Sequence, residues 1–175
     1  MTNAPIGLYV HLPWCVQKCP YCDFNSYEVR GAIAERLYVD ALMRDLDTEL
    51  TRMARPLISS VFIGGGTPSL FSAAAIARLM DGLRTRTTFA EDIEVTLEAN
   101  PGTAETARFR GYMAAGVNRL SLGIQSFDVV QLTRLGRIHD ADEAHRAIGM
   151  AREAGCNNLN LDLMFGLPQA QPGDA

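Results

Sequence analysis

The stretch that decides the fold is Cys15-Val16-Gln17-Lys18-Cys19-Pro20-Tyr21-Cys22, where three cysteines have the spacing C-x3-C-x2-C. It follows a short strand-like run that ends at Leu12. Thiolates are the usual ligands of iron–sulfur clusters, and a cluster is normally held by four of them. Three thiolates can hold three irons of a 4Fe–4S cube and leave one iron open to a substrate or cofactor. Three sulfurs that bind the same cluster must lie on a loop. Pro20 favours a loop here because it disfavours a regular helix.

Three alternative roles for these cysteines stay open at this point. A structural zinc site needs a fourth ligand, which would be His11 or the distant Cys156. A disulfide framework is less expected, because the chain has no signal peptide and is large enough for a real core. Buried structural thiols are the third alternative, although they rarely cluster at such close spacing.

Four further motifs follow the cysteines in the order of one known family. They are Gly64-Gly65-Gly66-Thr67-Pro68, Glu98-Ala99-Asn100-Pro101-Gly102, Gly123-Ile124-Gln125-Ser126-Phe127 and Asp162-Leu163-Met164-Phe165-Gly166-Leu167-Pro168. With the run from Tyr9 into the cysteines, they resemble the radical S-adenosylmethionine (SAM) superfamily. More narrowly, the chain is similar to the branch that holds oxygen-independent coproporphyrinogen III oxidases and HemW-like heme chaperones. The resemblance covers nearly the whole chain.

The composition limits the classes of protein to which the chain can belong. A chain of 175 residues is expected to form one domain, and 47% apolar residues are enough for a sizeable core. The formal net charge of −4 offers no basic surface to a nucleic acid. No apolar run approaches the roughly 20 residues of a membrane span. Free cysteines without a secretion signal indicate a reducing compartment, with a bacterial cytoplasm as the first choice and a mitochondrial matrix as the second.

Strand and helix patterns alternate along the chain. Apolar or alternating runs predict strands at residues 7–11, 57–63, 93–98, 119–124 and 158–164. Helices are predicted at about 32–54, after an N-cap at Ser72, around 109–116, at 128–135 and after the capping-box pair Asp140 and Glu143. This alternation predicts βα units with a parallel sheet, an α/β fold. The polar motifs fall where strands end, which is where βα barrels form their sites.

The resemblance, rather than the alternation, implies the kind of barrel. It implies a partial (β/α)6 radical SAM barrel, truncated after about five βα units. Residues 1–175 would form an incomplete radical SAM core domain, with the sixth unit and the family's C-terminal region missing after Ala175.

The resemblance also implies the cofactors and their ligands. Cys15, Cys19 and Cys22 would hold the 4Fe–4S cluster, and SAM would chelate the open iron through its amino and carboxylate groups. One electron from the cluster would cleave SAM to methionine and a 5′-deoxyadenosyl radical. The positions that match SAM contacts are Tyr9, Tyr21, Gly65, Gly66, Thr67, Glu98, Gln125, Arg137 and Asp162.

Several of these residues also have a physical reason to contact a cofactor. Each of them has an ordinary structural interpretation as well. The glycines allow close approach of the backbone to a ligand, but taken alone they indicate only a strand-ending turn. Glu98 can accept hydrogen bonds from SAM, although a lone carboxylate is more often simply exposed. Asp162 is the most informative, because an acid inside an apolar strand needs a partner if it is buried. The two tyrosines fit ordinary core or loop aromatics equally well.

The histidines and the fourth cysteine receive more modest interpretations. His11 lies beside the cysteine loop and is expected to hydrogen-bond there. His139 and His145 are interpreted as solvated residues at a helix end or face. Cys156 follows a helix-ending glycine and is interpreted as a small buried residue.

Phe24 separates the two members of the branch. The oxidase has a fourth cysteine two residues after the third, and this chain has Phe24 there. The resemblance then favours a HemW-like chaperone that binds SAM, a cluster and heme, and delivers heme to recipient hemoproteins, respiratory ones among them. Its heme-ligating region is expected downstream of Ala175. The alternative is the oxidase of porphyrin biosynthesis, so enzyme activity stays undecided. An RNA-modifying radical SAM enzyme is disfavoured by the acidic balance.

Overall fold

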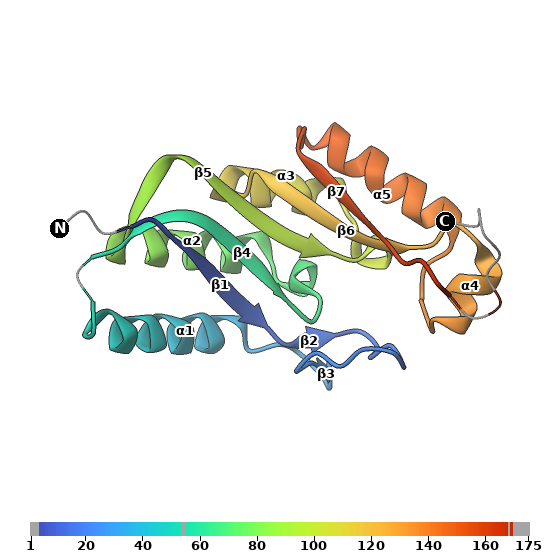
Figure 1. Ribbon diagram of the computed structural model, residues 1–175, viewed down its shortest axis with the longest axis horizontal. Helices are drawn as coiled ribbons and strands as arrows, with labels where there is room; N and C mark the ends of the chain where they lie inside the picture. Colours follow the sequence, from blue (N-terminus) through green and yellow to red (C-terminus); the bar gives the residue numbers. More distant parts are fainter. Residues whose placement is uncertain (1–3, 54, 168, 170–175) are drawn as a thin grey trace.

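The structure, a computed structural model, describes residues 4–53, 55–167 and 169. At its centre is a five-stranded sheet in the order β1-β4-β5-β6-β7, with every pair parallel (Figure 1). The strands are β1 (Ile6–Leu12), β4 (Leu57–Gly65), β5 (Thr88–Ala99), β6 (Arg119–Gln125) and β7 (Leu159–Leu163). Strands that follow one another in the chain are neighbours in the sheet, because the helix between them returns the chain to the same sheet end. The predicted α/β fold with a parallel sheet is confirmed.

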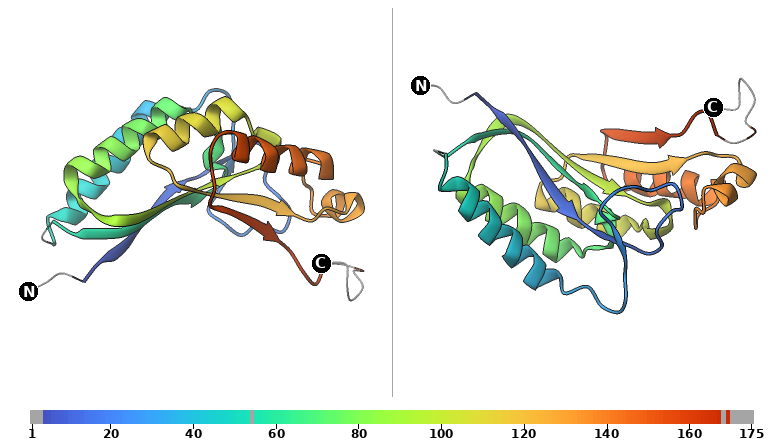
Figure 2. Two further views of the ribbon diagram at one scale, coloured as in Figure 1. Left: turned by 90° about the horizontal axis from the view of Figure 1, so that it is seen from above. Right: turned by 60° about the horizontal axis from the view of Figure 1, so that its bottom comes forward.

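Helices cover one face of this sheet, as both views of Figure 2 show. They are α1 (Glu35–Leu50), α2 (Ala73–Arg86), α3 (Thr106–Ala115) and α5 (Ala141–Glu153). The short helix α4 (Val129–Arg134) lies beyond the carboxyl end of β6, and the turns η1 (Pro68–Leu70) and η2 (Pro101–Thr103) follow β4 and β5. Within the described part of the chain, the opposite face of the sheet carries no helix. That face is therefore open.

The helix starts follow the capping residues that the sequence predicts. The hydroxyl of Ser72 accepts a hydrogen bond from the backbone N–H of Ala75 at 3.2 Å and begins α2. Asp140 and Glu143 form the predicted capping box, because each side chain accepts the backbone N–H of the other, at 2.7 and 3.0 Å. These bonds satisfy N–H groups that have no partner inside the helix. Both predictions are confirmed.

Three predicted boundaries are wrong, two in the first helix and one in the third strand. The first helix starts at Glu35 rather than near residue 32, because the chain turns just before it and the N–H of Glu35 donates to the carbonyl of Ile33 at 2.8 Å. It ends at Leu50, and Ala54 lies outside the described residues, as do Pro168 and residues 170–175. The third strand begins at Thr88 instead of residue 93, because this extension pairs with the start of β4.

The main core lies between the sheet and its helices. The side chains of Ile63, Leu97 and Leu120 point from three neighbouring strands into this layer and are 0% exposed. Tyr112 of α3 is also fully buried, and its hydroxyl donates to the carbonyl of Ser69 at 3.1 Å. Burial raises the pKa of this phenol, which stays neutral. Among the described residues, no helix is both long and apolar enough to cross a membrane.

Candidate functional site

A small second sheet, which the sequence does not predict, anchors the cysteine loop. Its strands, β2 (Trp14–Cys15) and β3 (Tyr27–Glu28), pair in parallel and have two residues each. Strands of this length show no periodic pattern that could be recognised beforehand. The backbone N–H of Val29 donates to the carbonyl of Cys15 at 2.9 Å. The segment after the third cysteine therefore returns to the loop and fixes the position of its first cysteine.

Lys18 closes the same loop by binding its far end. Its ammonium group donates to the carbonyls of Phe24 and Ser26, at 3.2 and 3.4 Å. Its backbone N–H donates to the carboxylate of Glu28 at 3.2 Å. The backbone N–H of Cys22 also donates to the carbonyl of Cys19 at 3.0 Å. The loop is thus held closed by the Lys18 side chain, the Glu28 carboxylate and its own backbone groups.

The three thiols of the loop line one cleft of about 360 Å³. Cys15 is buried, whereas Cys19 and Cys22 are half-buried. All are free thiols, which rules out the disulfide framework among the described residues. Burial raises the pKa of the Cys15 thiol, although hydroxyl groups beside it partly oppose this effect.

The donor set of the cleft is three thiols, and thiolates are the usual ligands of iron–sulfur clusters. No group of three or more His, Cys, Asp or Glu side chains in the described ranges is placed to hold one metal ion. The two residues that could complete a zinc site are engaged elsewhere: His11 bonds through Nε2 to the carbonyl of Asn25 at 2.8 Å, and Cys156 belongs to the core. A cube presents its irons at separate corners, so thiols spread around one cleft fit it.

Gly65 and Gly66, at the end of β4 and directly after it, allow this strand to end against the cysteine loop. Gly66 donates its N–H to the carbonyl of Leu12 at 2.8 Å, and a Cβ on Gly66 would lie 2.5 Å from the carbonyl oxygen of Trp14. Gly65 has a φ of +118°, which L side chains rarely adopt. Together with Thr67 they form one wall of the cleft. A side chain on Gly66 would push the cleft wall and the start of the loop apart, whereas one on Gly65 would meet His11 and Leu12 of β1.

Glu98 lies at the end of β5 and faces this glycine wall. Its carboxylate accepts the N–H of Gly65 at 3.1 Å. Burial raises the pKa of the carboxyl group, the Gly65 bond lowers it, and the negative charge of Asp162 raises it again. Glu98 is therefore a half-buried acceptor with its carboxylate turned into the cleft.

Asp162 has the partners that its position in an apolar strand requires. Ser121 donates its hydroxyl to the carboxylate at 3.1 Å, and Asn160 donates its amide N–H at 2.6 Å. Asn160 also donates to the hydroxyl of Ser121 at 3.0 Å. The sequence predicts that Asp162 needs a partner but does not identify Ser121 or Asn160. The only available signal was that Asn160 and Asp162 share a strand face.

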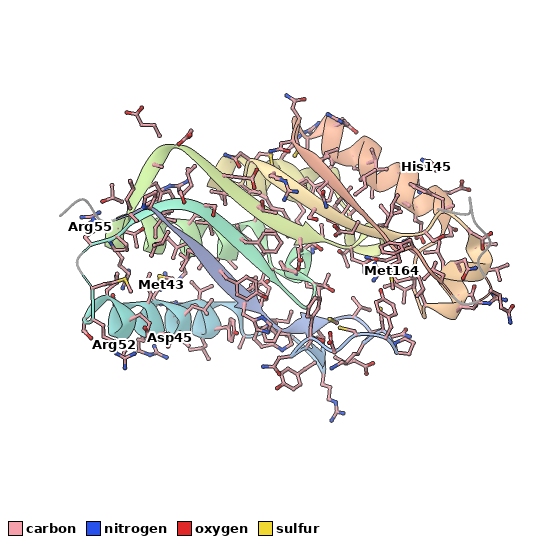
Figure 3. The ribbon with its side chains drawn as sticks, viewed as in Figure 1. Met43, Asp45, Arg52, Arg55, His145 and Met164 are labelled. Carbon is pink, nitrogen blue, oxygen red and sulfur yellow. The ribbon has the colours of Figure 1, made fainter. Side chains whose placement is uncertain are left out.

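Gln125, at the end of β6, and Arg137, after α4, both lie at the cleft. Gln125 ends β6 with a φ of 67°, and its carbonyl accepts the backbone N–H of Met164, which Figure 3 labels beyond β7. Arg137 donates from Nη2 to the carbonyl of Gly123 at 2.6 Å and from Nη1 to the sulfur of Cys19 at 3.6 Å. Both predicted site residues therefore line the cleft.

The two predicted tyrosines differ in position. Tyr21 lines the cleft, where burial raises the pKa of its phenol. Tyr9 is not among the lining residues. The residue is 56% exposed, its ring stacks on Phe62 with the centroids 6.2 Å apart, and its hydroxyl bonds to Nδ1 of His11 at 2.9 Å. The cofactor role of Tyr9 stays a prediction without support from this geometry.

The prediction that His139 is solvated is wrong. Only 3% of this residue is exposed, and its Nε2 lies 3.0 Å from the carbonyl of Ile124. Since a carbonyl can only accept, Nε2 carries the proton, and burial lowers the pKa of the ring. His139 therefore ties the segment after α4 to β6 as a neutral donor. His145 is exposed on α5, as predicted (Figure 3), and its ring stacks on that of Phe127.

The other two minor expectations are confirmed. Cys156 is buried, and its thiol donates to the carbonyl of Asn158 at 3.3 Å. His11 hydrogen-bonds to Asn25 beside the cysteine loop. Sequence reasoning also missed several residues that line the cleft: Gln17, Phe24, Pro68, Ala99, Asn100, Ser121 and Gly123. Most of them belong to the quoted motifs, so the motifs themselves were the available signal.

The chain is similar to known proteins over almost its entire length. The model of the family "Radical SAM superfamily" matches residues 9–174. The heme chaperone HemW of Haemophilus influenzae is 52% identical over 168 residues, which cover 94% of this chain and 44% of that protein. HemW of Escherichia coli is also 52% identical, over 164 residues that cover 94% of this chain and 43% of its own length. The chain thus spans less than half the length of these relatives.

A solved structure agrees with these sequence comparisons. The coproporphyrinogen III oxidase HemN of Escherichia coli, described as a radical SAM enzyme, superposes with a TM-score of 0.87 and 33% identity. The match covers 99% of this chain and 40% of the HemN chain. The partial barrel expected from the sequence is therefore the fold that this similarity supports.

Proposed function

This chain belongs to the radical SAM superfamily, and we propose that it is the cluster- and SAM-binding part of a HemW-like heme chaperone. The observation that carries this proposal is the meeting of the three loop thiols with the polar ends of β4, β5, β6 and β7 in one cleft. Each group comes from a different part of the sequence. A shared cleft gives a cluster and its cofactor one common site.

In this proposal, Cys15, Cys19 and Cys22 hold three corners of a 4Fe–4S cluster. When bound, the cluster and SAM supply one-electron and radical chemistry. The protein supplies placement: Cys15 is buried at the root of the loop, and Lys18 keeps the loop closed. The half-buried thiols of Cys19 and Cys22 stay accessible from the cleft.

The cleft offers SAM complementary charges. SAM carries a positive sulfonium, an ammonium and a negative carboxylate. Glu98 and Asp162 would accept from its donor groups, and Asp162 is held for this purpose by Ser121 and Asn160. Arg137 would face the carboxylate, and the backbone of Gly65–Thr67 would contact the methionyl part. Tyr21 and Gln125 would complete the contacts from the cleft lining.

A heme carrier is favoured over a coproporphyrinogen oxidase. Phe24 stands where the similar oxidases have a fourth cysteine, and its ring is 61% exposed beside the cleft. Identity to the HemW proteins is 52%, against 33% to HemN. We propose that the protein binds heme and delivers it to hemoproteins, respiratory ones among them. The oxidase is the second candidate, supported by the TM-score of 0.87.

A further βα unit and a bacterial cytoplasm belong to the same proposal. Leu161 and Leu163 are 38% and 52% exposed, and they alternate along β7 with Asp162, which lines the cleft, and with its partner Asn160. Their side of the strand is the one that helices cover elsewhere in the sheet, so another strand–helix unit would bury them. Free thiols are maintained in a reducing compartment, which supports the cytoplasm.

One anaerobic experiment separates the two candidates. The full-length protein, reconstituted with iron and sulfide, is mixed with SAM, dithionite and coproporphyrinogen III, and protoporphyrinogen is measured. We expect no porphyrin product, followed by a spectral change when hemin is titrated into the same sample. Porphyrin turnover would support the oxidase, and an absent hemin response would overturn the carrier proposal.

A further inference from the structure

The three cysteines of the loop have unequal surroundings. The thiols of Cys15 and Cys22 face hydroxyl groups, with the sulfur of Cys22 lying 3.8 Å from Oγ of Ser26. Cys19 faces the hydroxyl of Tyr21 and, in addition, the guanidinium of Arg137, whose Nη1 donates to its sulfur at 3.6 Å. Of the three, Cys19 is the one for which the described residues provide a cationic donor in hydrogen-bond contact.

This guanidinium is held in place by the backbone around it. Its Nη2 donates to the carbonyl of Gly123 at 2.6 Å, so one of the two terminal nitrogens of the guanidinium is fixed to β6. The backbone N–H of Arg137 donates to the carbonyl of Leu132 at 2.9 Å, and His139 ties the same segment to Ile124. The donor therefore does not have to be ordered when the thiol becomes a ligand.

Close packing brings the Arg137 segment onto the cysteine loop. Gly136 precedes Arg137, has a φ of +66°, and would place a Cβ 2.8 Å from Cδ of Pro20. Pro20 directly follows Cys19. A glycine at this position therefore lets the segment after α4 touch the loop, and it sets the distance between Arg137 and the sulfur.

We propose that Arg137 is a positioning residue that makes the cluster easier to reduce by donating a charge-assisted hydrogen bond to the sulfur of Cys19. The inference rests on the proposed function, because it requires the cluster to bind these cysteines. Reduction adds one electron, supplied by an external low-potential donor, and part of the added negative charge resides on the ligand sulfurs. A cationic donor stabilises the reduced state more than the oxidised one.

A redox titration of the reconstituted cluster without SAM tests this inference. Leaving SAM out removes any contribution from a contact between Arg137 and the cofactor. For Arg137→Gln we expect the equilibrium constant of one-electron reduction to fall at least tenfold, a potential lower by about 59 mV. Arg137→Lys keeps the charge but lacks the two terminal nitrogens of a guanidinium. Its reduction potential should lie between those of Arg137→Gln and the wild type.

Arg146→Gln provides the matched control. It removes the same charge from an exposed position on α5 and should leave the potential unchanged. A potential in Arg137→Gln equal to the wild-type value would overturn the inference, as would an equal fall in both variants. A wild-type chain that assembles no cluster would instead refute the proposed function.

A second measurement keeps the test decisive if Arg137→Gln assembles no cluster. In protein labelled with 15N-arginine, pulsed EPR of the reduced cluster should detect a nitrogen coupling that is absent from Arg137→Lys and retained in Arg146→Gln. This coupling reports the N–H···S contact itself, independently of activity. Its absence from the wild type would overturn the inference.

Discussion

The two sides of β6 show how differently this molecule builds its core and its site. Leu120, Leu122 and Ile124 point toward the helices and are 0% exposed. Between them, Ser121 and Gly123 reach the cleft on the other side. A single strand thus provides a packed apolar surface to one layer and isolated polar groups to the other. The core depends on the sum of many similar contacts, whereas the site depends on a few groups that have no equivalent nearby.

This difference predicts that changes on the cleft side affect cofactor binding and spare the fold. The largest effect is expected for Cys19→Ser, which removes a proposed cluster ligand without touching the core. Iron in the reconstituted chain should fall from about four atoms per polypeptide to background, with loss of the brown visible absorbance. Circular dichroism should show an unchanged fold.

Cys156→Ala is the matched control for the cysteine experiment. This cysteine is buried on the helix side and belongs to the core cluster. Its removal should leave the iron content intact and lower the free energy of unfolding. Full iron retention in Cys19→Ser, or iron loss in Cys156→Ala, would contradict the assignment of ligands.

Two neighbouring residues on β6 allow the core side and the cleft side of the strand to be compared directly. Leu120→Ala should lower the free energy of unfolding by about 2–5 kcal/mol, because it leaves a cavity in a core without exposed surface. Ser121→Ala, one residue later, should cost less than this and should mainly weaken SAM binding by releasing Asp162. Urea unfolding and equilibrium dialysis with labelled SAM measure the two effects. Equal losses of stability would remove the distinction between the two sides.

A smaller effect is expected for Asp162→Asn, which keeps the shape but removes a charge from the cleft. Hydrogen bonds to charged groups contribute about 1.5–3 kcal/mol, so SAM affinity should fall by roughly 10- to 100-fold. Asp142→Asn removes the same charge from the exposed first turn of α5 and should leave the affinity unchanged. Equal affinities for the two variants would show that Asp162 does not contact the cofactor.

The smallest expected effect concerns Glu98 and pH. Burial raises the pKa of this carboxyl above its unfolded value, so its contribution to stability is present below the unfolded pKa and is lost as pH rises through the folded pKa. Without cofactors, Glu98→Gln should therefore raise the free energy of unfolding at neutral pH by roughly 1 kcal/mol or less. Urea titrations from about pH 4 to pH 7 measure this. The exposed Glu91→Gln should show no such gain, and a loss of stability in Glu98→Gln would contradict the assignment.

The same contrast explains how much the sequence could predict. The helix-side residues repeat at regular intervals, so the strands and most helices were predicted with small errors at their ends. Local capping signals at Ser72 and Asp140 identified two helix starts. The two-residue strands β2 and β3 were not predicted, since their pairing depends on a contact between separate segments of the chain.

The cleft was only partly predictable for a related reason. The motifs and their resemblance to a known family indicated most of the residues that line it. The partners of these residues, such as Ser121 and Asn160 for Asp162, are isolated polar side chains without a periodic signal. His139 was misplaced because its burial depends on how the segment after α4 packs against β6. Tyr9 matched a motif, yet its side chain lies outside the cleft lining.

The central claim is that three cysteines leave one iron of the cluster open to SAM. EPR spectroscopy of the reduced, reconstituted chain before and after addition of SAM tests it most directly. We expect SAM to change the signal of the cluster, and we expect Asp162→Asn to need a higher SAM concentration for the same change. A reduced 4Fe–4S signal that does not respond to saturating SAM would contradict the account, because the cluster would then have no iron available to the cofactor.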